Sequence, residues 1–100
     1  METDKSVAVE IIKQLGGAGK IMAMTGVKTF ISESNAVSFR FKGSKKANWV
    51  KIKLNAMDTY DIEFKKIRGM NFPTTASFDG VYNDQLKSIF ESTTGLYLSL

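Results

Sequence analysis

The residues best suited to chemistry in this chain lie at positions 36–53, where two alternating segments flank a Gly-Ser-Lys-Lys turn. Alternation directs one set of side chains into a core and the other set to solvent. The solvent-facing set is basic, and the whole stretch contains no acidic residue. Basic side chains spaced in this way on paired strands can neutralise successive phosphates. The candidate nucleic-acid-binding residues are Arg40, Lys42, Lys45, Lys46, Trp49, Lys51 and Lys53.

The same stretch has a second interpretation, as an ordinary solvated face of a sheet. Outward lysines are common on soluble sheets, where they discourage edge-to-edge association. The next strand is expected to carry Asp61 and Glu63 on this face, roughly opposite two of the lysines. Opposite charges across strands contribute about 0.2–1 kcal/mol per pair and cancel much of the local field. Trp49 is the only aromatic residue expected on this face, whereas single-strand-binding modules usually present several.

A second basic cluster follows the acidic strand and consists of Lys65, Lys66 and Arg68. The cluster has two interpretations, because it either extends the patch that begins at Arg40 and Lys42 or simply flanks a loop. The sequence alone leaves both open.

Two further patterns lack essential parts of the sites they resemble. A phosphate-binding loop requires Gly, four residues and then Gly-Lys-Ser/Thr between a strand and a helix. Gln14 stands where the first glycine is required, and the glycine-rich segment at residues 16–20 follows a predicted helix. The carboxylates of Asp58, Asp61 and Glu63 do not have the ligand order of a calcium loop. We therefore predict no metal site and no cofactor.

Composition narrows the function classes further. The chain has 100 residues, 43% of them hydrophobic and 24% charged, which predicts a single domain over residues 1–100. It contains no cysteine and no histidine, which excludes disulfides, thiolate ligands and imidazole-dependent catalysis. We therefore expect a protein that is not an enzyme. The net charge of +4 and the isoelectric point near 9.4 weakly favour a polyanionic partner.

Two amphipathic helices are predicted, one near each end of the chain. The first covers residues 3–15, with Thr3 or Ser6 as its cap, and two glycines end it. The second begins at a capping Asp79 and ends near Thr94, followed by Gly95 at the usual terminating position. The apolar face of each helix is formed by Val7, Ala8, Ile11, Ile12 and Leu15 in the first and by Tyr82, Leu86, Ile89 and Phe90 in the second.

Between these helices, three adjacent alternating segments predict an antiparallel meander. Their inward positions are Val37, Phe39, Phe41, Val50, Ile52, Leu54, Tyr60, Ile62 and Phe64. Residues 20–31 are predicted as one strand with a bulge at Gly26 or as two short strands, and residues 76–78 as a further short strand. The expected fold class is α+β, an antiparallel β-meander of three to five strands with an N-terminal and a C-terminal helix packed on one face, in α-β-β-β-α order. Whether residues 20–31 extend the sheet or close a barrel stays open.

Several blocks of the sequence resemble segments of a known group of proteins. The blocks are QLGG, AMTGVKTF, SFRFKGSKKANWVKIKLNAMDTYDIEF, KKIRG and GVYNDQLKSIFESTTGLY. Together they resemble a group of small uncharacterised proteins of tailed bacteriophages and prophages, for which no activity is known. The resemblance implies an accessory protein in the host cytoplasm or inside the virion. It assigns no site residue.

The sequence therefore leads to two alternative functional hypotheses. The first is a non-enzymatic accessory binding protein that contacts DNA or RNA through the basic hairpin. The alternative is a protein-binding accessory factor, an inhibitor of a host enzyme or a virion component, using the hairpin or an apolar tail at residues 97–100. No membrane partner is expected, because no apolar run approaches about 20 residues and no secretory signal is evident. Specificity and oligomeric state stay open.

Overall fold

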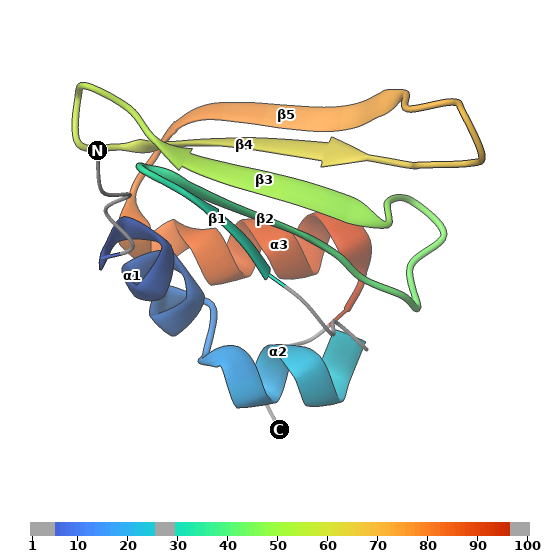
Figure 1. Cartoon of the computed structure of the whole chain (residues 1–100), viewed down its shortest axis with the longest axis horizontal. Coiled ribbons are helices and arrows are strands. Elements are labelled where there is room, and N and C mark those ends of the chain that lie inside the picture. Colours follow the sequence, from blue (N-terminus) through green and yellow to red (C-terminus); the bar gives the residue numbers. More distant parts are fainter. Residues whose placement is uncertain (1–5, 26–29, 97–100) are drawn as a thin grey trace.

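The computed structural model describes residues 6–25 and 30–96 of the chain. The elements are α1 (Ser6–Gln14), α2 (Ala18–Thr25), β1 (Phe30–Glu33), β2 (Ala36–Arg40), β3 (Trp49–Leu54), β4 (Tyr60–Lys65), β5 (Thr74–Val81), a 3-10 helix (Asn83–Gln85) and α3 (Leu86–Thr94). The five strands form one antiparallel sheet in the order β1-β2-β3-β4-β5, and the helices lie on one side of it (Figure 1). The predicted α+β meander is confirmed.

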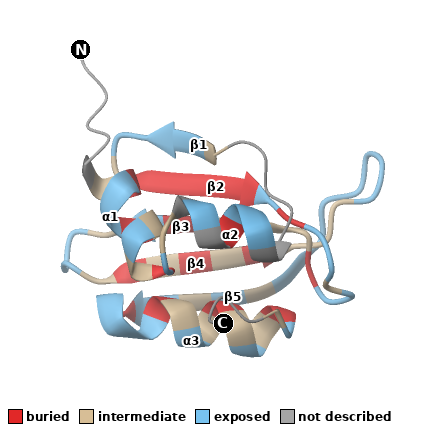
Figure 2. Cartoon of the chain, turned by 90° about the horizontal axis from the view of Figure 1, so that it is seen from below, coloured by how far each residue is buried: buried red, intermediate tan, exposed pale blue. Residues whose placement is uncertain are grey.

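The core lies between the sheet and the helices. Strands β3 and β4 alternate buried and more exposed residues, as a sheet with one covered face requires. The covered face meets buried side chains from each helix, including Ile11 of α1 and Ile21 of α2. Phe90 of α3 is the aromatic centre of this layer, with ring centroids 5.1 Å from Phe41 and 6.1 Å from Phe39. Figure 2 marks buried positions in red on the central strands and on the helices that cover them.

The register fixes which side chains share the outer face, the one away from the helices. The directly opposed pairs include Arg40 with Trp49, and Trp49 with Lys65. Ser38 also belongs to this face but is only 5% exposed, although alternation predicted an outward, solvated position. It is a small side chain opposed by Ile31 on one neighbouring strand and by a lysine on the other, so larger neighbours surround it.

The prediction of strands throughout residues 20–31 is wrong in its first part, because residues 18–25 form α2. Ala, Lys and Met are good helix formers, and these residue types outweigh a short apolar run that could also have been a strand. The helix begins where the amide of Ile21 donates to the carbonyl of Gly17, at 3.1 Å. The end of the predicted segment, residues 30 and 31, does lie in a strand, because β1 starts there, continues to Glu33 and extends the sheet as an edge strand. The predicted break at Gly26 lies outside the described residues.

The start of the last helix also differs from prediction. Asp79 caps no helix, because β5 is an eight-residue strand that continues through this position to Val81. Tyr82, predicted on the apolar face of the helix, is 62% exposed, and its amide donates to the side chain of Gln85 at 3.1 Å. A positive φ of 66° at Gly80 allows β5 to bend before the 3-10 helix starts.

The C-terminal ends of α1 and α3 agree with prediction. Gly16 and Gly17 follow α1 with positive φ, and Gly95 ends α3 in the left-handed conformation, with φ 78°. The predicted cap at Thr3 and the apolar tail at residues 97–100 lie outside the described residues.

Candidate nucleic-acid interface

The outer face of the sheet divides into a charge-balanced part and a basic part. In the balanced part, Lys51 opposes Glu63 across the β3–β4 pair, and Lys53 opposes Asp61. The Lys51 ammonium forms an ion pair with Glu33 of β1, at 3.3 Å. This arrangement is the solvated sheet face that alternation of charge predicted.

The carboxylates of the balanced part have further polar partners. One oxygen of Asp61 accepts hydrogen bonds from the Asn55 side chain, at 3.0 Å, and from the Gly80 amide, at 3.4 Å. Glu63 accepts a hydrogen bond from the Thr74 hydroxyl at 3.0 Å. A phosphate brought to this surface would meet fixed negative charge, which makes Lys51 and Lys53 poor anion ligands.

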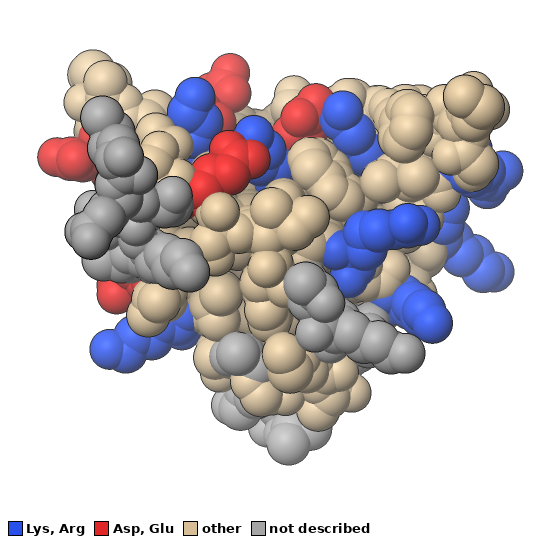
Figure 3. Space-filling model, in the orientation of Figure 1, with Lys and Arg blue, Asp and Glu red and all other residues tan. Residues whose placement is uncertain are grey.

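The basic part lies at the other end of these strands. There the loop after β2, residues 41–48, lies beside the loop after β4, residues 66–73, and neither loop contains an acidic residue. Figure 3 shows Lys and Arg side chains gathered over this end, whereas the Asp and Glu side chains in view lie over the rest of the molecule. We call this surface the basic end; its cations are Arg40, Lys42, Lys45, Lys46, Lys65, Lys66 and Arg68.

Hydrogen bonds hold the two loops together. The Asn48 side chain donates to the carbonyl of Ile67, at 2.9 Å, and accepts from the amide of the same residue, at 2.7 Å. The Lys66 ammonium donates to the carbonyl of Ser44, at 3.1 Å. The Ser44 hydroxyl in turn donates to the carbonyl of Thr94 at the end of α3, at 2.7 Å. The spacing of the cations is therefore fixed by the fold rather than left to two independent loops.

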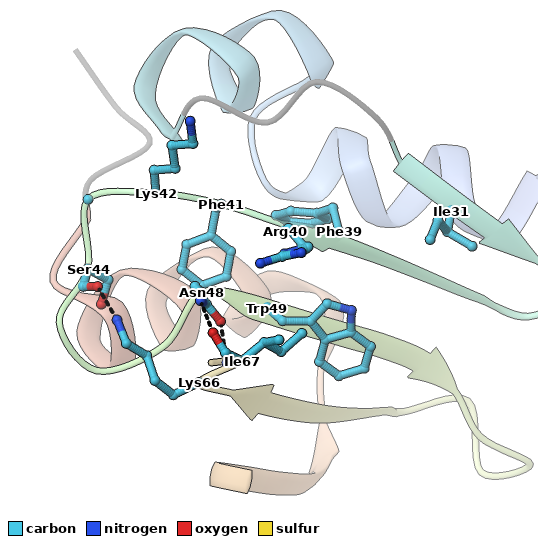
Figure 4. A pocket seen from close by; sticks show the side chains of 11 residues that line it. Ile31, Phe39, Arg40, Phe41, Lys42, Ser44, Asn48, Trp49, Lys66 and Ile67 are labelled. Carbon is cyan, nitrogen blue, oxygen red and sulfur yellow. Dashed lines mark hydrogen bonds between the residues drawn. The ribbon is translucent and has the colours of Figure 1, made fainter. Parts of the chain in front are cut away.

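A cavity of about 690 Å³ opens between these loops and the end of β2 (Figure 4). Its apolar lining comes from Ile31, Phe39, Phe41, Trp49 and Ile67, and its polar lining from Arg40, Lys42, Gly43, Ser44, Asn48 and Lys66. The volume falls within the roughly 300–1,000 Å³ typical of small-molecule sites. The lining therefore combines apolar and aromatic residues with three cations, Arg40, Lys42 and Lys66, which we call the rim cations.

Trp49 is half-buried at the side of this cavity. It lies between two cationic residues on neighbouring strands, since it opposes Arg40 on β2 and Lys65 on β4. The Lys65 ammonium lies 5.4 Å from the centroid of the indole, within the range of a cation–π contact. An aromatic ring flanked by cations is suited to a ligand that is both planar and anionic.

The structure thus divides the seven predicted nucleic-acid-binding residues into two groups. Arg40, Lys42 and Trp49 line the cavity, and Lys45 and Lys46 are exposed on the same loop beside it. Lys51 and Lys53 belong to the charge-balanced part of the sheet.

Sequence reasoning left the second basic cluster unassigned, and the structure places it beside the first. Lys66 lines the same cavity as Arg40. The apolar and amide members of the lining were missed, above all Phe41, Asn48 and Ile67. A signal for Ile67 was present, because it is the one apolar residue inside the Lys-Lys-Ile-Arg run.

Within residues 6–25 and 30–96, no group of three or more Asp, Glu, His or Cys side chains is placed to hold a metal ion. None of the helices in the described part of the chain has the length and apolar character needed to cross a membrane. Comparison with family models, with curated proteins and with solved structures gives no match to this chain.

Proposed function

We propose that this chain is a non-enzymatic accessory protein that binds nucleic acid through the basic end. The observation that supports this most is the grouping of seven cations at the basic end, where three of them, Arg40, Lys42 and Lys66, line one cavity and the two loops contain no carboxylate. Phosphate neutralisation by such a cluster gives affinity with little sequence preference and a strong dependence on salt. The resemblance to phage proteins suggests the host cytoplasm or the virion as the place of action.

The test compares two double variants that change the net charge equally. Lys45→Glu with Lys46→Glu reverses two exposed cations of the basic end, and Lys13→Glu with Lys53→Glu reverses two exposed cations elsewhere. Binding is measured as the fluorescence anisotropy of labelled 20-nucleotide DNA and RNA at low salt. We expect the first variant to lose at least tenfold in affinity and the second to lose several-fold less. Equal losses would mean that only net charge matters, and would contradict a defined interface.

A second candidate function is favoured by an apolar tip on the loop of residues 66–73. Met70, 91% exposed, is in a two-residue turn that Arg68 and Asn71 close with two backbone hydrogen bonds of 2.9 Å, and Phe72, 57% exposed, follows this turn. Exposed large apolar side chains at the end of a defined turn suit a protein partner. On this alternative, the chain is a protein-binding accessory factor that inhibits a host enzyme or joins a virion complex.

The two candidates separate in an affinity capture performed after nuclease treatment. A protein partner bound through the tip would be retained in stoichiometric amount, and it would be lost with Met70→Ser and Phe72→Ser. Loss of all partners upon nuclease treatment would favour the nucleic-acid proposal instead.

A further inference from the structure

The cavity at the basic end combines apolar and cationic residues in one lining. Phe39 and Phe41 are almost completely buried on the helix side of the sheet, where they pack against Phe90, so they offer a ligand little surface. The accessible apolar lining comes from the exposed Ile31 and the partly exposed Trp49 and Ile67. Trp49 and Ile31 contribute to the apolar lining, and Arg40 lies beside Trp49 on the neighbouring strand (Figure 4). No carboxylate of the described residues lines it.

The cations at the rim are placed for the phosphates next to such a base. Arg40 and Lys42 come from β2 and its following residues, and Lys66 comes from the facing loop, so positive charge lies on both sides of the opening. The Lys66 ammonium donates one hydrogen bond to Ser44 and keeps two further donors for a ligand. Outside the cavity, the exposed Lys45 and Lys46 continue the positive surface along the loop.

We propose that this cavity receives one unpaired base of a single-stranded nucleic acid, stacked against Trp49, while the rim cations bind the phosphates on either side. This inference rests on the proposed function and makes it more specific. In a duplex, both faces of each base are covered by its neighbours, so a paired base cannot enter a side-chain pocket without being unstacked. A single strand presents its bases freely, and stacking on an aromatic side chain adds affinity whatever the base.

The test separates the phosphate contribution from the base contribution. Three labelled ligands of equal phosphate number are titrated at low salt: a 12-nucleotide thymidine strand, a 12-nucleotide strand of abasic sugar-phosphate, and a hairpin duplex. Stacking of one base increases affinity about 5- to 150-fold. We therefore expect the thymidine strand to bind at least fivefold more tightly than the abasic strand.

Variants assign that difference to the cavity. With Trp49→Leu, the thymidine and abasic strands should bind with nearly equal affinity, whereas Trp49→Phe should keep part of the preference. Tyr82→Leu is the matched control, because Tyr82 is an exposed aromatic residue on the connection between β5 and the 3-10 helix, and it should leave the preference unchanged. Circular dichroism melting of each variant checks that the fold is kept.

The outcomes distinguish this inference from the proposed function. Equal binding of the thymidine and abasic strands by the unmodified protein would overturn the base site and leave phosphate binding intact. No binding of any of the three ligands at low salt would overturn both proposals. Binding of free thymidine monophosphate as tightly as of the strand would also overturn the inference, because the site would then recognise a free nucleotide and not a strand.

Discussion

The Asn48 side chain links the two loops of the basic end, and its removal gives a direct measure of how firmly the fold sets their spacing. The side-chain carboxamide of Asn48 makes two hydrogen bonds with the backbone of Ile67, at 2.7 and 2.9 Å, in a partly buried position. A typical hydrogen bond contributes about 1 kcal/mol net, and an unpaired backbone group away from solvent costs about 1–3 kcal/mol. We expect Asn48→Ala to lower the free energy of unfolding by about 2–3 kcal/mol.

For a chain of this length, a loss of that size lowers the melting temperature by about 10–20 °C. The assay is thermal unfolding followed by circular dichroism, with Asn83→Ala as the control. Asn83 is exposed and follows the end of β5 that pairs with Tyr60, whereas the two loops lie at the opposite end of β4, beyond Lys65. The control should change stability by less than about 0.5 kcal/mol. A shift for Asn48→Ala no larger than that of the control would refute the claim that this link holds the loops together.

Two further predictions concern the core and the alkaline stability. Phe90→Ala should cost about 3–5 kcal/mol in urea unfolding, because it removes the ring at the centre of the aromatic layer, whereas Phe72→Ala, on an exposed side chain, should cost far less. Burial, then the negative charges of Glu10 and Asp58, raises the pKa of Tyr60 above its ordinary value of 10.0. The folded protein thus keeps a proton that the unfolded chain has lost, so this stabilisation is complete below about pH 10 and is lost as the pH rises further. Tyr60→Phe should make unfolding measured from pH 9 to 11 less dependent on pH, and an unchanged dependence would contradict this account.

The central strands could be predicted from sequence because two independent patterns agreed there. Alternation placed Val50 and Ile52 inward, and the opposite charges of Lys51 and Glu63 fixed which residues face each other. The prediction failed at α2, because residues 21–24 form a short uninterrupted apolar run, which shows no helical period although Ile21 is buried and Met22 exposed.

The cavity was beyond sequence reasoning for a different reason. Its parts come from β1, from the end of β2 with its loop, and from the loop after β4, which only the folded sheet brings together. Phe41 illustrates the difficulty, since alternation correctly assigned it to the core and gave no sign that it also borders an open cavity. The balance of charge around Lys51 was predictable, but its actual ion-pair partner, Glu33, lies on a strand that was only loosely placed.

The salt dependence of single-strand binding tests the central claim most directly. Affinity for a labelled 20-nucleotide DNA is measured by anisotropy at 50 and at 200 mM salt. If the basic end neutralises about four phosphates, the logarithmic slope for a single strand is about −2.8, and the fourfold rise in salt lowers affinity about 50-fold. Our account predicts a loss of this order, reduced by Lys45→Glu with Lys46→Glu. No binding at 50 mM, or an affinity that hardly changes with salt, would contradict a phosphate-binding basic end.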